Sequence, residues 1–250
     1  MKKYELTNET KTLAGGTVLH RIRALRDIPR FGVKAGELGG FVEGENNLSQ
    51  DGDAWVFCNA NVYGNAEVYD NSNVSGDTWV FGNAKVYDDA EVYGKAWVFG
   101  NTWVFGNAKV YGNAWVFGNT EVYGYAKVYG DAWVLGYAEI SGNAEISGNA
   151  CVSGDACVSG YANVSGNADV YGDADYTVIK NIWSSGMWFT YTSSNKKWAD
   201  GCFYGTGEEL IKKAYADSEL SGRCYEAIVR AVETIEAAKA EAKGESNGSK

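Results

Sequence analysis

The sequence is poor in several residue types on which catalysis, metal binding and membrane insertion depend. It has one histidine, His20, one proline and five cysteines among 250 residues. No apolar run approaches the roughly 20 residues of a membrane-spanning helix, and the Met1-Lys2-Lys3 start lacks the apolar core of a signal peptide. We therefore expect a cytoplasmic protein that does not enter a membrane.

The cysteines indicate neither a disulfide framework nor a metal site. Their number is odd, and no two of them have the Cys-x-x-Cys spacing of a zinc or redox site. We expect free thiols, and no metal or other cofactor. The five residues are Cys58, Cys151, Cys157, Cys202 and Cys224.

Charge is unevenly distributed along the chain, whose net charge is −10. Residues 1–40 carry eight Lys/Arg and four Asp/Glu, residues 41–175 carry four and eighteen, and residues 176–250 carry ten of each. Because the central region is acidic, we expect it to bind nucleic acid poorly.

A repeat of six residues fills that central region. An apolar β-branched residue returns every sixth position, twenty times from Val56 to Val170, and it is valine everywhere except at Ile140 and Ile146. Two residues before each of these lies a small residue, alanine in sixteen cases and serine or threonine in the other four. A Gly-Asn or Gly-Asp pair usually separates the repeats. Self-similarity at a fixed period indicates a solenoid.

Each repeat predicts one short strand and one corner. In a Trp-Val-Phe or Lys-Val-Tyr triplet the valine points inward and its neighbours point outward, because side chains alternate along a strand. Glycine and asparagine then turn the corner, since both tolerate the left-handed backbone region. The alanine before the next strand fills the crowded interior of the corner.

This pattern resembles the hexapeptide repeat of left-handed parallel β-helices, in which a small residue follows the aliphatic one by four places. The resemblance implies three-sided coils of eighteen residues, six to seven in all, and a rod roughly 30 Å long at ~4.8 Å per coil. The left hand departs from the usual crossover rule and follows from the resemblance alone. A right-handed solenoid is the alternative.

A second resemblance concerns the N-terminal region. The segment from Arg21 to Gly40, continuing into Leu48-Ser49-Gln50, resembles the start of a widespread family of bacterial and prophage-borne hexapeptide-repeat proteins that are mostly uncharacterised. The resemblance covers residues 1 to about 175 and implies a fold more firmly than an activity. A phage-encoded chain would act in the cytoplasm of its host cell.

The fold class expected is mainly β, a left-handed parallel β-helix with an N-terminal β cap and a small C-terminal α+β domain. We expect a cap over residues 1–50, the β-helix over 51–175, the C-terminal domain over 176–243 and a disordered tail over 244–250. Val42 and Leu48 already keep the six-residue spacing, whereas Leu48 and Val56 are eight apart, so two extra residues precede the regular array.

The arginines of the cap allow two interpretations. They can form a basic patch for an anionic partner, or a solvated face with ion pairs, and we favour the second. The residues are Arg21, Arg23, Arg26 and Arg30.

The C-terminal region predicts a βββαα order. Three aromatic strands are expected over residues 176–183, 187–192 and 197–204, followed by helices over 206–218 and 223–242. Thr206 and Glu209 form a capping box at the start of the first helix. The second helix has one apolar stripe: Tyr225, Ile228, Val229, Val232 and Ile235. This domain either caps the solenoid or binds a partner.

One side of the coil concentrates aromatic residues. Residues eighteen positions apart are expected on the same side of successive coils. On one side, a tryptophan precedes the inward valine in four successive coils, and a phenylalanine follows it in three of them. Stacking of like rings stabilises neighbouring strands in any solenoid. It does not explain why Trp and Phe are concentrated on one side, and this concentration predicts a binding surface. Its residues are Trp79, Trp97, Trp115, Trp133, Phe81, Phe99 and Phe117.

Three functions remain open at this point. The first is a non-enzymatic binding or scaffold protein that forms a dimer or trimer through these rows and engages a host protein, for example by inhibiting a defence system. The second is a glycan-binding module or phage fibre element. The third is the acyltransferase that the repeat family implies, which uses a histidine base beside a coil. We expect no enzyme and no catalytic residue, because His20 lies outside the array and the array contains no inserted loop that could form a pocket.

Overall fold

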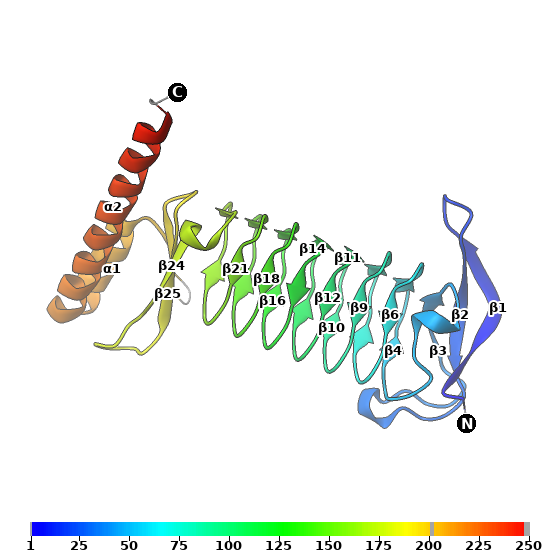
Figure 1. The fold of residues 1–250 in the computed structure, drawn as a ribbon. Helices are drawn as coiled ribbons and strands as arrows, with labels where there is room; N and C mark the ends of the chain where they lie inside the picture. Colours follow the sequence, from blue (N-terminus) through cyan, green and yellow to red (C-terminus); the bar gives the residue numbers. More distant parts are fainter. Residues whose placement is uncertain (1, 201–202, 248–250) are drawn as a thin grey trace. The chain divides into compact units, whose positions relative to one another are not determined.

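The structure is a computed structural model that describes residues 2–200 and 203–247 (Figure 1). It contains a parallel β-solenoid of about seven turns, an antiparallel sheet and two C-terminal helices, which confirms the predicted fold class. The hand of the coil stays a prediction from the resemblance.

The solenoid has three parallel sheets, one on each side of the coil. The first contains β5 (Asn61–Val62), β8 (Trp79–Val80), β11 (Trp97–Gly100), β14 (Trp115–Gly118), β17 (Trp133–Val134), β20 (Cys151–Val152) and β23 (Asp169–Val170). The second contains β6 (Glu67–Val68), β9 (Lys85–Val86), β12 (Trp103–Val104), β15 (Glu121–Val122), β18 (Glu139–Ile140) and β21 (Cys157–Val158). The third contains β4 (Trp55–Val56), β7 (Asn73–Val74), β10 (Glu91–Val92), β13 (Lys109–Val110), β16 (Lys127–Val128), β19 (Glu145–Ile146) and β22 (Asn163–Val164).

The register confirms an eighteen-residue turn. Each strand pairs with the strand one turn along the chain, as Trp97 pairs with Trp115 and Val98 with Val116. The inward valines and isoleucines have no solvent exposure, and the alanines two residues before them are at most 1% exposed. The interior is therefore a continuous column of β-branched side chains lined by small corner residues.

The corners differ from the prediction in one respect. The left-handed conformation falls on the glycine, as at Gly82 with φ 73°, and not on the asparagine that follows it. A Cβ on Gly94 would lie 2.9 Å from the backbone nitrogen of Gly112, so the close stacking of corners also excludes a side chain at this position. The asparagine side chains point outward instead.

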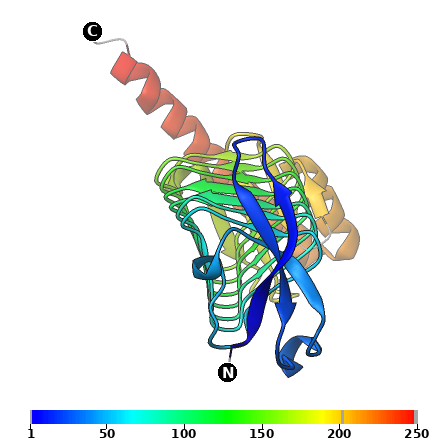
Figure 2. The same ribbon diagram turned by 90° about the vertical axis from the view of Figure 1, so that its right-hand side faces the viewer.

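The N-terminal cap is continuous with the first sheet. Strands β1 (Tyr4–Thr12) and β2 (Val18–Ala24) are antiparallel, and β3 (Leu38–Val42) pairs with β2 on one side and with β5 on the other. Figure 2 looks onto this end, with the blue cap strands in front of the stacked coils. Strand β3 therefore covers the edge of the first sheet at this end of the solenoid. Covering an exposed strand edge prevents end-to-end association between solenoids.

The first coil carries the two extra residues that the spacing predicts. Val42 pairs with Val62, and Leu48 forms a bridge with Val68, so both partners are twenty residues apart. From Val56 onward the partners are eighteen apart. The insertion thus lies between Leu48 and the first regular repeat.

Lys3 is fully buried in the cap, which the sequence did not predict. Its Nζ donates hydrogen bonds to the carbonyl oxygens of Ala54 at 2.8 Å and Asp51 at 3.2 Å. Burial, with a further contribution from nearby Arg26, lowers the Lys3 pKa to about 8. A buried ammonium group therefore joins the N-terminal strand to the start of the repeats.

The four cap arginines form ion pairs, as the favoured interpretation expects. Arg21 lies 3.0 Å from Glu9 and Arg30 lies 2.5 Å from Asp89, between nitrogen and carboxylate oxygen. The other pairs are Arg23 with Glu5 and Arg26 with Asp53.

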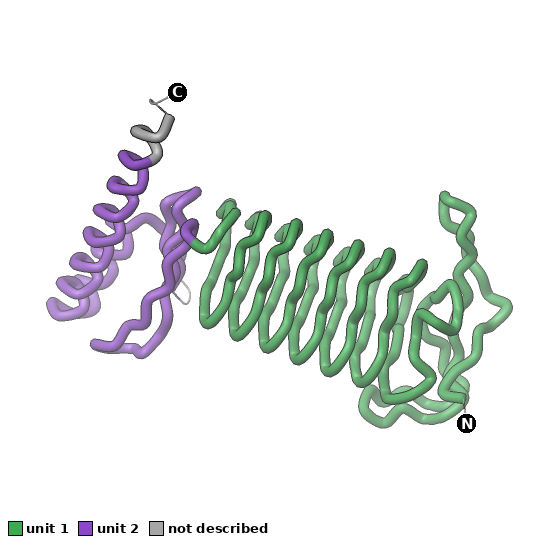
Figure 3. Tube along the Cα trace, in the orientation of Figure 1, with its two compact units in different colours: residues 1–173 green, residues 174–250 purple. Residues whose placement is uncertain are grey.

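The described residues from 174 onward form a second compact unit, coloured purple in Figure 3, where residues 1–173 are green. Its sheet has the order β24 (Tyr176–Lys180), β25 (Trp188–Thr192), β26 (Lys197–Asp200) and β27 (Phe203–Gly205), antiparallel throughout. Two helices follow, α1 (Gly207–Asp217) and α2 (Glu219–Asn247). Thr206 and Glu209 form the predicted capping box.

Two predictions for this unit were wrong in detail. The expected strand over 197–204 is two antiparallel strands, β26 and β27, and residues 201–202 between them lie outside the described part. Helix α2 begins at Glu219 instead of Arg223. The expected disordered tail, 244–250, overlaps the end of α2, and its residues 248–250 also lie outside the described part.

The core of the second unit is aromatic. Phe189 and Trp198 from the sheet pack with Leu210 of α1 and Val229 of α2, and all four are at most 2% exposed. Of the predicted stripe on α2, Ile235 is 54% exposed and faces away from this core.

Candidate functional site

The predicted Trp and Phe rows lie side by side on the first sheet, carried by β8, β11, β14 and β17 and the residues that follow these strands. We call these seven residues the aromatic face. They are Trp79, Trp97, Trp115, Trp133, Phe81, Phe99 and Phe117.

Within each row the rings stack face to face along the solenoid. The centroids of Trp97 and Trp115 are 5.1 Å apart with planes at 8°, and those of Phe81 and Phe99 are 4.9 Å apart with planes at 2°. The stacking repeats at Phe117. The faces of these rings therefore cover one another, and their edges form the outer surface.

The two rows also contact each other. Each phenylalanine meets the tryptophan one coil further on edge to face, as Phe81 meets Trp97 at 6.0 Å and 80° and Phe99 meets Trp115 at 6.2 Å and 78°. Offset stacks and edge-to-face contacts are the arrangements that aromatic rings prefer. The aromatic face is consequently one interlocked layer.

Exposure along the Trp row changes at its end. Trp79, Trp97 and Trp115 are partly buried, whereas Trp133 is 46% exposed. Trp133 pairs across the sheet with Cys151, so no further ring covers its second face.

At the other end, Tyr63 of the first coil and two cap residues, Lys11 and Phe41, extend the aromatic face, and the sequence predicted no such place for the two cap residues. Tyr63 stacks on Phe81 at 4.9 Å. The Nζ of Lys11 lies 4.1 Å from the ring centroid of Phe41 and 5.8 Å from that of Trp79. Burial and the neighbouring Arg21 charge lower the Lys11 pKa. The eighteen-residue period points to Tyr63, but no local signal in the sequence places Lys11 here.

Polar ladders run along both corners beside the aromatic face. After the Phe row, the side-chain amides of Asn65, Asn83, Asn101 and Asn119 form a chain of hydrogen bonds of 2.8 to 3.0 Å. Before the Trp row, Asn113 donates to Asp131 at 2.9 Å in the same manner. An apolar centre with polar rims is the anatomy of a protein interface.

The other two sides have a different composition. Each has a single aromatic row, as in the stack of Tyr93, Tyr111 and Tyr129 on the third side, where burial raises the Tyr111 pKa to about 12. Charged residues precede most of the inward valines there, although Trp103 is an exception, and Lys127 pairs with Glu145 at 2.8 Å. These sides therefore present ion pairs where the first side presents tryptophan.

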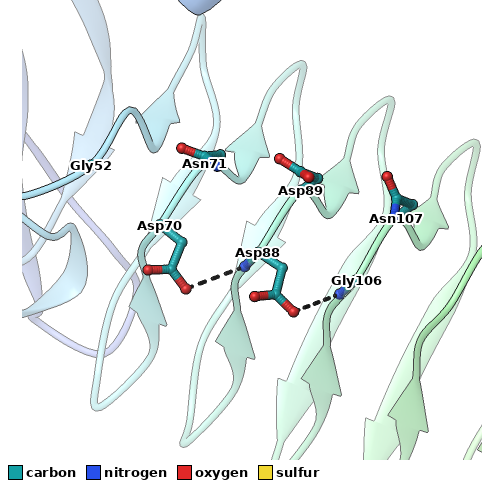
Figure 4. Close-up of a pocket in the computed structure, with 7 residues that line it drawn as sticks. All are labelled: Gly52, Asp70, Asn71, Asp88, Asp89, Gly106 and Asn107. Carbon is teal, nitrogen blue, oxygen red and sulfur yellow. Dashed lines mark hydrogen bonds between the residues drawn. The ribbon is translucent and has the colours of Figure 1, made fainter.

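One corner column carries aspartates at positions where most corners have glycine. Asp70 and Asp88 adopt the left-handed conformation with φ of 57° and 55°. The Oδ2 of Asp70 accepts a hydrogen bond from the Asp88 backbone N–H at 3.5 Å, and that of Asp88 accepts one from Gly106 at 3.1 Å (Figure 4). The carboxylates thus brace successive corners along a shallow hollow.

No metal site is found among the residues that the structure describes, since no three His, Cys, Asp or Glu side chains are grouped to hold an ion. None of the described helices is both long and apolar enough to cross a membrane.

His20 lies in β2, within the cap sheet. Its Nδ1 is 3.3 Å from the carbonyl oxygen of Thr7 on the paired strand β1. The ring therefore serves the packing of the cap and does not lie beside a solenoid coil.

Comparison with known proteins gives no relative for the chain: no protein-family model matches it, and no curated protein sequence matches it. The resemblance to hexapeptide-repeat proteins and the link to phages stay predictions.

Proposed function

We propose that the chain is a non-enzymatic binding and scaffold protein that self-associates through the aromatic face. The observation that carries this proposal is the orientation of the rings, whose faces are stacked on one another and whose edges point outward. A flat apolar layer of ring edges between polar rims matches the centre and rim of a protein interface. A second copy is the simplest partner, because one patch then serves both chains in a closed assembly.

The ring orientation disfavours the glycan alternative at this surface. Sugars stack on exposed faces of aromatic rings, and in the aromatic face those positions are taken by the next ring at about 5 Å. At the ends of the two rows, Trp133 is followed one coil on by Cys151 and Phe117 by Leu135, so each of these rings has one face without a stacked ring. The aromatic face therefore suits a protein surface better than a sugar.

A further protein partner belongs to the same proposal. The acidic and tyrosine-bearing sides, or the second unit, would hold a protein of the host cell, and the resemblance to prophage-borne proteins makes inhibition of a defence system the role proposed. The position of His20 within the cap sheet supports a function without catalysis.

The test is the oligomeric state measured by light scattering at micromolar concentration. The Trp97→Lys/Trp115→Lys double variant should be monomeric with an unchanged circular dichroism spectrum, while the wild type is a dimer or trimer. Trp103→Lys is the matched control, because Trp103 is a 42% exposed tryptophan on the second side and should leave the assembly intact. A monomeric wild type would exclude self-association and leave a different protein, or a glycan, as the partner of these rows.

A further inference from the structure

We infer that the groove between Tyr125 and Tyr161 is a sugar-binding site, separate from the aromatic face. Both tyrosines lie at corners where most repeats have asparagine or aspartate, and they are 62% and 51% exposed. They line one groove of about 390 Å³ together with Asn143.

The spacing of the two rings is the first argument. Tyr125, Asn143 and Tyr161 occupy the same corner on three successive coils, so the tyrosines are separated by two strand spacings, roughly 9.6 Å. Tyrosine and phenylalanine neighbours one coil apart in this solenoid stack at 4.8 to 4.9 Å. The coil between the two tyrosines carries a short amide side chain, which leaves room for one ring-sized group between them.

The polar lining is the second argument. The amides of Asn107 and Asn143 and the Lys127–Glu145 ion pair line the same groove. Amide and charged groups can donate to and accept from the hydroxyls around the edge of a pyranose, while its C–H faces contact aromatic rings. A purely apolar ring would leave these groups without hydrogen-bonding partners in the ligand. The mixed lining therefore favours a pyranose over an aromatic ligand.

The chain contains an internal comparison. Tyr137 is a corner tyrosine that is even more exposed, at 68%, but it lies in a different column. On the two coils before Tyr137 the same corner carries asparagine, Asn101 and Asn119. On the coil after Tyr137 it carries Asp155. Tyr125 and Tyr137 are thus both exposed corner tyrosines, but only Tyr125 has a second tyrosine at the same corner two coils away. Tyr137 therefore serves as the matched control.

The experiment is saturation-transfer NMR with four probes at millimolar concentration: methyl α-glucoside, methyl β-galactoside, N-acetylglucosamine and glucuronic acid. At least one should receive saturation from the wild type and from Tyr137→Ala. Tyr125→Ala and Tyr161→Ala should each weaken that sugar's binding by roughly tenfold. Asn143→Tyr should abolish binding, because its ring would fill the space at ladder spacing, without lowering the melting temperature.

Each other outcome overturns the inference. Absence of saturation transfer to all four sugars would do so, as would binding that survives Tyr125→Ala and Tyr161→Ala or is lost equally in Tyr137→Ala. Indole is included as a fifth probe, and binding of indole with none of the sugars would identify the groove as an aromatic site instead. The two alanine variants change exposed side chains, so the test stands even if Asn143→Tyr fails to fold. It does not depend on the oligomeric state.

Discussion

The inside and the outside of the solenoid are built by neighbouring residues of the same strands, yet they obey different constraints. Inside, twenty equivalent positions accept only valine or isoleucine, and none of these side chains reaches solvent. Outside, the residue next to each of them can be tryptophan, lysine, glutamate, asparagine or cysteine. The fold is determined by the first set and tolerates almost anything in the second.

This difference explains how a repetitive chain acquires specific surfaces. Because stacking places each outward residue directly beside its equivalent on the next coil, a change repeated every eighteen residues becomes a row. The Trp and Phe rows of the aromatic face and the spaced tyrosines of the corner groove are two products of that rule. Rings in every coil cover one another's faces, whereas rings in alternate coils leave a space between them.

The largest expected effect is the difference in stability between an inward and an outward substitution on one strand, β13. Val110→Asp places an unpaired carboxylate in the buried column and should lower the free energy of unfolding by on the order of 4 kcal/mol or prevent folding. Lys109→Ser, on the same strand as Val110, removes a half-exposed ion pair with Glu91 of the neighbouring strand β10 and should cost about 0.5 kcal/mol or less. Urea denaturation of both variants measures the difference. Equal losses would mean that the strand faces are assigned wrongly.

A buried charge at the N-terminal end of the interior gives the next largest effect. Lys3 has a pKa of about 8 in the folded protein against an ordinary value of 10.5, so between these values the unfolded chain binds more protons. Stability should therefore rise with pH in this window, by between about 1 and 2 kcal/mol from pH 7.5 to pH 9.5. The measurement is urea denaturation at both pH values in the wild type and in Lys3→Met.

Lys3→Met is the control because it lacks the titrating group but keeps the length of the side chain. Its stability should change less over this interval than that of the wild type, whatever its absolute stability. The same rise in both proteins would assign the pH dependence to another group whose pKa is lowered in the folded protein, such as Lys11.

Ring stacking on the outside should contribute less than the interior does. Phe99→Ala removes stacked contacts with Phe81 and Phe117 and an edge contact with Trp115, at an expected cost of about 1 to 2 kcal/mol. Trp103→Ala removes a larger ring that lies between Lys85 and Glu121 on the neighbouring strands, and should cost about 0.5 kcal/mol or less. Thermal unfolding, measured at concentrations where both variants are monomers, compares their losses of stability. A greater loss for Trp103→Ala would show that ring size, and not stacking, determines the contribution.

Much of the solenoid could be predicted from the sequence because its contacts repeat the chain period. The inward Val column, the alanine corners, the eighteen-residue register and the two extra residues before Val56 all follow from spacing. The corners were predicted less well, since sequence alone treats glycine and asparagine as equally suited to the left-handed region. At most corners the residue in this conformation is glycine, because a Cβ would crowd the next corner, a contact eighteen residues away; Cys58, Asp70 and Asp88 are exceptions.

The candidate sites were only partly predictable for the same reason. The membership of the aromatic face follows from the period, but the direction of its ring faces depends on side-chain packing that no spacing specifies. Lys11 reaches Trp79 across 68 positions of the chain, and Lys3 contacts Ala54 across 51, so neither contact has a local signal. Tyr125 and Tyr161 depart from the asparagine or aspartate of most corners, but their spacing alone does not show that they line one groove.

No effect on function is expected from a change at His20, the one residue that could restore an enzymatic interpretation. Its ring lies in β2 with Nδ1 near the Thr7 carbonyl, so His20→Ala removes one partly buried contact of the cap and should cost about 1 kcal/mol. If the chain acts by binding, the oligomeric state and the capture of its partner should be unchanged at temperatures where the variant is folded. His20→Gln is the matched control, since it keeps a polar side chain on the strand. A loss of biological activity in both variants, with melting temperatures equal to that of the wild type, would show that the imidazole takes part in a reaction and would contradict the binding function proposed here.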